Sequence, residues 1–197
     1  MELRNEISSL PFIEELDRLK SVLRRTMTFD ASRLENTAEH SWHLAMAVLV
    51  SADLSNEPIV LEQAVKMALT HDIVEIDAGD TFLYDGGANA DKTDRERRAA
   101  ERLFGLLPAN IDNDLRDLWE RYERQECAES KFVMAFDRFL PLTANFKTQG
   151  RSWKKHGIKK NQVMQLNEKI AKGSRKLWQY AEAMINEAVK LGYLPTE

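Results

Sequence analysis

The chain has 197 residues, 43% of them hydrophobic, which suits one compact domain spanning residues 1–197. Its 28 Lys and Arg residues are outnumbered by 32 Asp and Glu residues, and the net charge of −4 argues against a protein that binds the phosphate backbone of nucleic acids. With only 8 Gly and 5 Pro residues among many helix-favouring ones, the composition also excludes collagen-like, low-complexity and all-β chains.

Apolar residues recur at intervals of three and four along most of the chain, which is the pattern of helices that each bury one stripe. The first predicted helix covers residues 10–28, with Pro11 in its first turn, and the second covers residues 37–54. Further helices are predicted at residues 58–72, 91–107, 112–124, 130–145 and 160–191. We detect no repeat and no linker that divides them, so we expect a single all-α helical bundle.

Residues 78–90 interrupt the helical pattern. They hold three of the eight glycines together with several acidic and amide residues, a composition that favours an irregular loop. Loops of this length are often functional, so we expect this one to border a site and to close over a substrate.

The single cysteine and the lengths of the apolar runs indicate the cellular compartment of the protein. Cys127 has no second cysteine with which to form a disulfide or a cysteine-based zinc site, and this favours a reducing compartment. The first residues are charged and mixed, unlike a secretory signal, and the longest apolar run, residues 44–50, is too short to cross a bilayer. We therefore expect a cytoplasmic protein with no membrane partner.

Three of the four histidines, His40, His43 and His71, lie within one short region, and Asp72 follows the last of them directly. Imidazole nitrogen with carboxylate oxygen is the donor set that zinc, manganese, cobalt or iron ions prefer, whereas Mg²⁺ and Ca²⁺ favour oxygen alone. His40 and His43 are three residues apart on one helix face, so either one can face the His71–Asp72 pair. A histidine bonded to a backbone carbonyl in the core is the alternative, and spacing alone leaves both interpretations open.

Two further acids extend this candidate metal site. Asp137 lies in the apolar run KFVMAFDRFLPL, where a buried carboxylate needs a metal or, as the alternative, a salt bridge with Arg138 or a distant arginine. Glu75 follows His71 by four residues and Asp72 by three, so all three share a face if the helix continues that far. Glu75 then suits a general acid or base beside the metal, and a solvated surface glutamate is the alternative.

The order of these residues resembles the signature of the HD-domain metal-dependent phosphohydrolases, which is a histidine, an adjacent His-Asp pair and a later aspartate. The segments RLENTAEHSWH and HDIVEIDAGD are similar to those of the small 5'-deoxynucleotidases in this family, and NFKTQGRSWKKHGI is similar to a stretch in many relatives. The resemblance covers residues 25–158 and implies an HD-type helical fold that removes phosphate from (deoxy)nucleoside 5'-monophosphates. The metal ligands that it implies are His40, His71, Asp72 and Asp137.

The resemblance also implies roles for neighbouring residues. Glu75 is the implied catalytic glutamate, and Asp80 is the implied acid near the sugar. Arg25 is implied to meet the phosphate during catalysis, with Arg33 as a second phosphate-binding candidate. Relatives with two or three metals carry further histidines between the His-Asp pair and the final aspartate, and this chain has no histidine between Asp72 and Asp137. One divalent ion is therefore implied, and His43 becomes a supporting or core residue.

Several properties stay open at this point. The characterised 5'-deoxynucleotidases usually carry a tryptophan beside the phosphate-binding arginine, but this chain has Thr26, so the preference between ribose and deoxyribose is open. The basic segment 147–160 either attracts an anionic nucleotide or is a solvated connector. Relatives are commonly homodimers, which implies one here. The alternative functions are hydrolysis of another phosphoester, such as a nucleoside triphosphate or an alarmone, and non-catalytic binding of metal or nucleotide.

Overall fold

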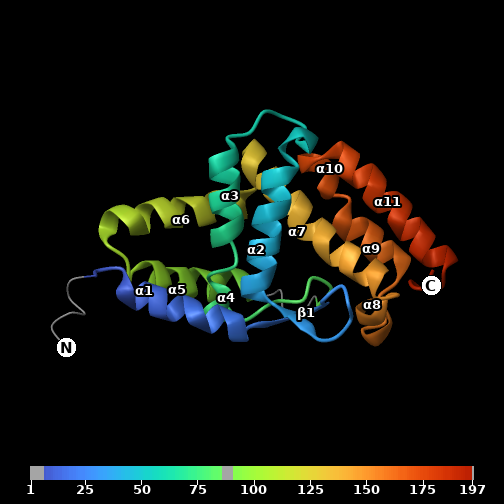
Figure 1. Ribbon diagram of the computed structural model, residues 1–197, viewed down its shortest axis with the longest axis horizontal. Helices are drawn as coiled ribbons and strands as arrows, with labels where there is room; N and C mark the ends of the chain where they lie inside the picture. Colours follow the sequence, from blue (N-terminus) through green and yellow to red (C-terminus); the bar gives the residue numbers. More distant parts are fainter. Residues whose placement is uncertain (1–6, 86–90, 197) are drawn as a thin grey trace.

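The computed structural model describes residues 7–85 and 91–196, and helices make up most of it (Figure 1). The longer elements are α1 (Leu10–Leu16), β1 (Leu23–Met27), β2 (Leu34–Asn36), α2 (Thr37–Val50), α3 (Leu61–Thr70), α4 (Glu75–Ala78), α5 (Lys92–Phe104), α6 (Ala109–Arg124), α7 (Ala128–Lys147), α8 (Arg151–Lys155), α9 (Lys160–Asn167), α10 (Ile170–Gly173) and α11 (Arg175–Lys190). Two short 3-10 helices are η2 (Asp17–Ser21) and η3 (Ala52–Leu54). The prediction of an all-α fold is confirmed, with one small hairpin in the described ranges added to it.

Helix α7 runs through the centre of the molecule and packs against α2, α3, α6, α10 and α11 (Figure 1). Its side chains Phe132, Val133 and Ala135 have no exposed surface and join a large hydrophobic core with α2, α3 and the C-terminal helices. A second apolar cluster joins α1, α4 and α5 with Trp119 of α6. This packing fixes α2, α3 and α7 against one another, and the candidate metal ligands lie on or next to these three helices.

The N-terminal segment differs from the predicted helix 10–28, which is wrong beyond residue 16. The chain passes through η2 into β1, which pairs antiparallel with β2 so that Leu23 faces Asn36 and Met27 faces Leu34. The apolar spacing that suggested a helix stops at Leu23, which is itself 58% exposed. Hydrogen bonding to a strand ten residues away therefore overrides a weak helical pattern.

The predicted helix 160–191 is divided into α9, α10 and α11. At the second break α10 packs so closely on α7 that a Cβ at Gly173 would lie 2.1 Å from the Lys131 carbonyl oxygen. The break leaves backbone groups without a partner inside a helix, and the side chain of Asn56 bonds to two of them. Its amide donates to the Ala171 carbonyl at 2.8 Å, and its oxygen accepts from the Arg175 amide at 2.9 Å. The apolar spacing continues across this break, so the sequence pattern does not reveal it.

The predicted loop and the basic segment are partly described. Residues 79–85 are irregular, as expected, while residues 86–90 of the predicted loop lie outside the described residues. The basic segment 147–160 contains the short helix α8 and the fully packed Trp153, which is 1% exposed. None of the helices in the described ranges is long and apolar enough to cross a membrane.

Candidate active site

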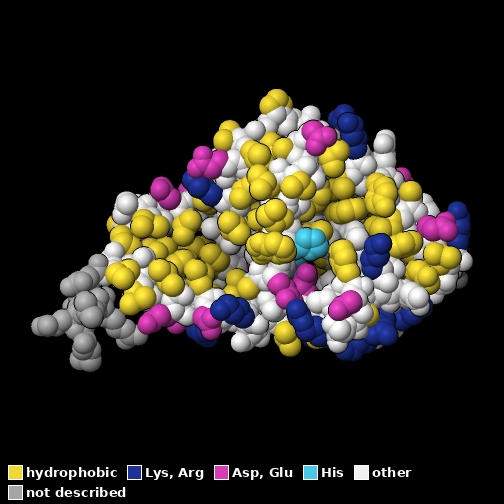
Figure 2. All heavy atoms as spheres, viewed as in Figure 1, with side chains coloured by type: hydrophobic (Ala, Val, Ile, Leu, Met, Phe, Trp, Pro, Cys, Tyr) yellow, Lys and Arg dark blue, Asp and Glu magenta, His cyan; other side chains and the backbone are white. Residues whose placement is uncertain are grey.

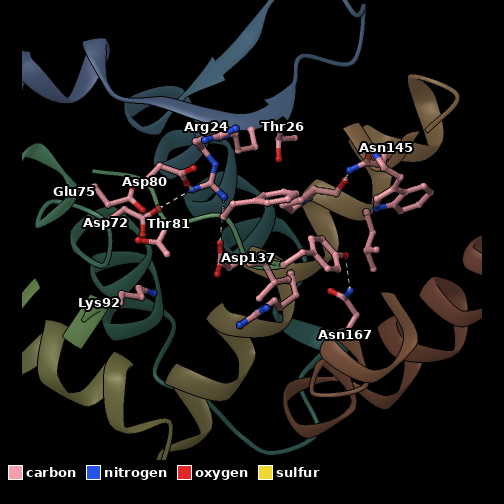
Figure 3. Close-up of a pocket in the computed structure, with 18 residues that line it drawn as sticks. Arg24, Thr26, Asp72, Glu75, Asp80, Thr81, Lys92, Asp137, Asn145 and Asn167 are labelled. Atoms are coloured by element: carbon pink, nitrogen blue, oxygen red, sulfur yellow. Dashed lines mark hydrogen bonds and ion pairs between the residues drawn. The ribbon is translucent and has the colours of Figure 1, made fainter. Parts of the chain in front are cut away.

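A cavity opens where β1, the turn after α4, the start of α5 and helices α7 to α9 meet. It encloses about 870 Å³ when the space in its open mouth is counted. Asp72, Glu75 and Asp80 gather at one end, Asn145 lies at the other, and Asp137 lies between them (Figure 3). The cavity thus has an acidic end and an amide-bearing end.

His40 is placed by the capped start of α2. The Asn36 side chain accepts a hydrogen bond from the Glu39 amide at 3.0 Å, and the Glu39 carboxylate accepts one from the Asn36 amide at 2.7 Å. One turn further on, His40 has no exposed surface, and its Nε2 lies 2.9 Å from Oδ1 of Asp137. Its Nδ1 lies 3.5 Å from Oε2 of Glu35 and makes no hydrogen bond with the described residues.

His71 and Asp72 lie in a turn, because α3 ends at Thr70. Nδ1 of His71 donates to the Ala68 carbonyl at 3.0 Å, so in the neutral ring this bond leaves Nε2 as the free nitrogen. That Nε2 lies 3.1 Å from Oδ2 of Asp72 and 3.8 Å from Oδ1 of Asp137. The turn therefore presents an imidazole nitrogen and a carboxylate to the same point.

Asp137 completes this group from the middle of α7. Its Oδ2 accepts a hydrogen bond from the Tyr122 hydroxyl at 3.0 Å, while its Oδ1 faces His40. Burial favours the neutral acid, but the contacts with His40 and His71 outweigh it and hold the pKa of Asp137 well below its usual range. The distant arginine of the salt-bridge alternative is Arg24, whose Nη2 is 4.0 Å from Oδ1, at the limit of an ion pair.

The four side chains fit a divalent transition-metal ion. Ligand atoms of His40, His71 and Asp72 lie within 4.8 Å of one another, and Asp137 adds a second carboxylate. Nε2 of His71 is buried and makes no well-aligned hydrogen bond with the described residues, a cost that a bound cation removes. Burial lowers the pKa of His71, but Asp72 and Asp137 raise it to about 10, so this point attracts positive charge. Two imidazoles with two carboxylates match the donor set of zinc, manganese, cobalt or iron ions.

Glu75 and Asp80 line the cavity beside these ligands. Glu75 is only 6% exposed and accepts a hydrogen bond from the Thr37 hydroxyl at 2.8 Å, so the surface-glutamate alternative is wrong. Burial, followed by the charge of Asp72, raises the pKa of Glu75 well above its usual value. Burial also raises the pKa of Asp80, although Arg24 opposes the rise. A carboxyl group that keeps its proton toward neutral pH suits general acid–base chemistry.

Arg24 reaches the acidic end of the cavity, and sequence reasoning missed it. Its Nη1 lies 3.0 Å from Oδ2 of Asp72 and 3.7 Å from Oδ1 of Asp80. Side chains alternate along β1, so Arg24 and Thr26 face the cavity together, while Arg25, which also contributes to its wall, is exposed (Figure 3). Because the sequence predicted a helix here, it gave no reason to prefer Arg24, and the alternation of a strand would have supplied one.

Arg33 and His43 are absent from the wall of this cavity. Arg33 binds the carboxylate of Glu39 through both terminal nitrogens, with Nη2 at 2.8 Å from Oε2, and its side chain is 57% exposed. It supports the start of α2 from outside the cavity, and its role as a substrate-binding residue stays a prediction. His43 packs its ring against Phe29, with 5.6 Å between the ring centroids. His40 is therefore the histidine of α2 that faces His71.

At the other end of the cavity, the sequence predicted that the loop holding Phe82 and Tyr84 borders a site, but it did not predict the individual residues. The wall there includes the aromatic and amide side chains Phe82, Tyr84, Asn145, Trp153 and Asn167. The Asn167 amide donates to the Tyr84 hydroxyl at 3.4 Å, and the Phe82 ring contacts the rings of Tyr84 and His156. These residues come from four separate segments, so no local pattern brings them together.

Comparison with known proteins supports this assignment of the fold. A family model described as the HD domain matches residues 16–178. The crystal structure of a predicted metal-dependent phosphohydrolase from Magnetospirillum magnetotacticum is 46% identical, with a TM-score of 0.91 over 95% of this chain and 94% of that one. The 5'-deoxynucleotidase HDDC2 of Bos taurus is 32% identical over 139 residues, which are 70% of this chain and 66% of that protein. The 5'-deoxynucleotidase hdd1 of Schizosaccharomyces pombe is 26% identical over 155 residues, which are 74% and 75% of the two chains. The matched part is thus just under two thirds of the length of the Bos taurus relative.

Proposed function

The chain belongs to the HD domain family, and on this premise we propose that it is a metal-dependent phosphomonoesterase that removes phosphate from (deoxy)nucleoside 5'-monophosphates. The observation that carries the proposal is the convergence of two buried imidazoles with Asp72 and Asp137, two carboxylates on the wall of an open cavity, and with the buried Glu75 beside them. The names of the matched relatives, 5'-deoxynucleotidases and a metal-dependent phosphohydrolase, support the same reaction.

The roles of the residues follow from their positions. His40, His71, Asp72 and Asp137 hold one divalent ion, for which zinc, manganese, cobalt and iron are the candidates. The bound ion supplies Lewis-acid chemistry, which makes water a better nucleophile and offsets charge on phosphate oxygens. Glu75 exchanges a proton with the attacking water or the leaving 5'-oxygen. Arg24 orients Asp72 and Asp80 through its ion pairs.

The nucleoside occupies the rest of the cavity. Asp80 accepts a hydrogen bond from a sugar hydroxyl, and the aromatic rings of Phe82, Tyr84 and Trp153 offer apolar surface for a base. Arg25, exposed on the wall, contributes positive charge that attracts the substrate. Thr26 is a smaller side chain than the tryptophan expected there, so we propose that selection between ribose and deoxyribose is weak.

We also propose that the chain acts as one domain over residues 1–197, in the cytoplasm, and as a homodimer. The reduced Cys127 fits a reducing compartment. The outer face of α2 carries Trp42, Met46 and Val50, which are 64%, 39% and 72% exposed. Apolar side chains gather over the middle of the molecule in the view of Figure 2, and a second copy of the chain is the partner that we propose for this face.

The test measures phosphate release from a panel of ribo- and deoxyribonucleoside 5'-monophosphates. Nucleoside triphosphates and alarmones are assayed in parallel as alternative substrates. We expect release from the monophosphates after chelated protein is resupplied with Mn²⁺, Co²⁺ or Zn²⁺. Asp72→Ala and Asp137→Ala should lose both metal and activity. Full metal content in both variants would contradict the ligand set, and cleavage confined to a triphosphate or an alarmone would contradict the substrate class.

A further inference from the structure

Arg138 is a cation on the wall of the cavity that is left without a partner. It follows Asp137 on α7, and its Nη1 is buried with no hydrogen-bond acceptor among the described residues. No ion pair within 4.0 Å joins it to a carboxylate in the described ranges, in contrast to Arg24. A buried guanidinium nitrogen without an acceptor destabilises the folded protein. The position of this nitrogen beside a cavity indicates that a ligand in the cavity supplies the acceptor.

The other cations near the acidic end already have carboxylate partners. Arg24 lies 3.4 Å from Glu35, 3.0 Å from Asp72 and 3.7 Å from Asp80. Lys92 lies 3.4 Å from Oε1 of Glu96. The positive charge of these side chains is therefore directed at the protein's own carboxylates, and little of it is free for an incoming anion.

The net charge at the acidic end of the cavity also favours a further cation. A divalent ion and Arg24 together carry three positive charges, while the carboxylates of Glu35, Asp72, Asp80 and Asp137, all within 4.0 Å of Arg24, carry four negative charges when ionised. The sum is one negative charge, and a phosphate monoester brings up to two more. A cation on the cavity wall that has no carboxylate partner of its own offsets part of this charge.

The surroundings of Arg138 leave it available for this purpose. Arg138 shares the wall of the cavity with Tyr84, and the hydroxyl of Tyr122 contacts Asp137, the residue before Arg138. Neither hydroxyl neutralises the guanidinium, because the Tyr122 hydroxyl donates a hydrogen bond to Asp137 and the uncharged Tyr84 hydroxyl accepts one from Asn167. Neighbouring residues on a helix point about 100° apart, so Asp137 can face the metal while Arg138 faces the adjacent wall.

We propose that Arg138 binds the phosphate group of the substrate directly, as the anion-binding side chain next to the metal ligands. This inference rests on the proposed function for the identity of the substrate. The paired donors of a guanidinium match two phosphate oxygens, so the side chain both binds the phosphate and fixes its orientation.

The test is calorimetric titration of inorganic phosphate into protein that holds one equivalent of metal. Arg138→Gln should weaken phosphate binding about 10- to 100-fold, and Arg138→Lys should recover part of the loss. Arg175→Gln, which removes the same charge from an exposed position on α11, should bind phosphate as the wild type does. Metal content and the unfolding midpoint of each variant show whether the site and the fold are intact.

Two outcomes would overturn the inference. One is unchanged phosphate affinity in a metal-loaded, folded Arg138→Gln variant. The other is loss of affinity for a nucleoside that lacks phosphate, with phosphate affinity unchanged, because the guanidinium would then contact the sugar or base. Turnover is measured separately: a wild type that binds phosphate through Arg138 but hydrolyses no monophosphate would contradict the proposed function and leave this inference standing.

Discussion

Tyr122 orients Asp137 through a single hydrogen bond at 3.0 Å, and its ring packs edge-on against His71. Tyr122→Phe removes the bond and keeps the ring, so we expect metal affinity to fall about 10-fold or more with little loss of fold stability. Competition with a chromophoric chelator measures the affinity. Tyr180→Phe, at a site that is 65% exposed, is the matched control, and equal affinities in the two variants would contradict the role of the hydroxyl.

Glu96 makes the stability of the protein depend on pH. Burial, with Lys92 opposing and Glu123 assisting, raises its pKa from 4.5 to about 7. The folded state therefore binds this proton more tightly than the unfolded state does, and the stability contributed by the proton is lost as pH rises from 4.5 to 7. Glu96→Gln carries no such proton, so its free energy of unfolding relative to wild type should be about 1–3 kcal/mol greater near pH 8 than near pH 4.5. Urea unfolding at both pH values measures this, and a difference independent of pH would contradict it.

At the scale of single residues, the sequence predicts the candidate metal ligands better than it predicts the arginine that pairs with their carboxylates. His40, His71, Asp72 and Asp137 stand out because they are rare or costly side chains in apolar segments, and the structure brings them together. Arg24 does not stand out, because Arg25 is chemically identical and only the strand register distinguishes the two. Which arginine faces the cavity depends on pairing between β1 and β2, which a local pattern does not encode.

At the scale of elements, Gly150 allows the segment after α7 to approach the C-terminal residues. Its φ is +74°, and a Cβ there would lie 1.9 Å from the Tyr193 carbonyl oxygen. Gly157 has a similar φ of +63° but has no atom within 4 Å of such a Cβ. We expect Gly157→Ala to cost about 1 kcal/mol of unfolding free energy and Gly150→Ala roughly 2 kcal/mol more. Urea unfolding compares the two, and equal losses would show that the close approach is not rigid.

The helices were predictable where one apolar stripe meets the core, and their breaks were not. The predicted helices 91–107, 112–124 and 130–145 match α5, α6 and α7 apart from their ends. The division of residues 160–191 depends on the contact of Gly173 with α7 and on Asn56, more than a hundred residues away, which pairs with the freed backbone. Both are tertiary contacts, so the local spacing of apolar residues does not reveal them.

At the scale of the whole molecule, the exposed face of α2 predicts self-association. The side chain of Trp42 is 64% exposed, so Trp42→Glu should leave the fold intact. The new charge should disrupt an apolar interface between two copies of the chain. Sedimentation should show a dimer for the wild type and a monomer for this variant. Leu191→Glu, at the end of α11 and 49% exposed, is the control that should stay dimeric. A monomeric wild type would contradict the proposed assembly.

The most direct test of the account is phosphate release from a deoxynucleoside 5'-monophosphate by wild type and Glu75→Gln, each stripped of metal and reloaded with Mn²⁺, Co²⁺ or Zn²⁺. We expect release by the wild type that stops on chelation, and a rate about 100-fold or more lower in Glu75→Gln at equal metal content. Release that persists in chelator, or that is undiminished in Glu75→Gln, would contradict it. So would a wild type that binds one metal per chain and releases no phosphate.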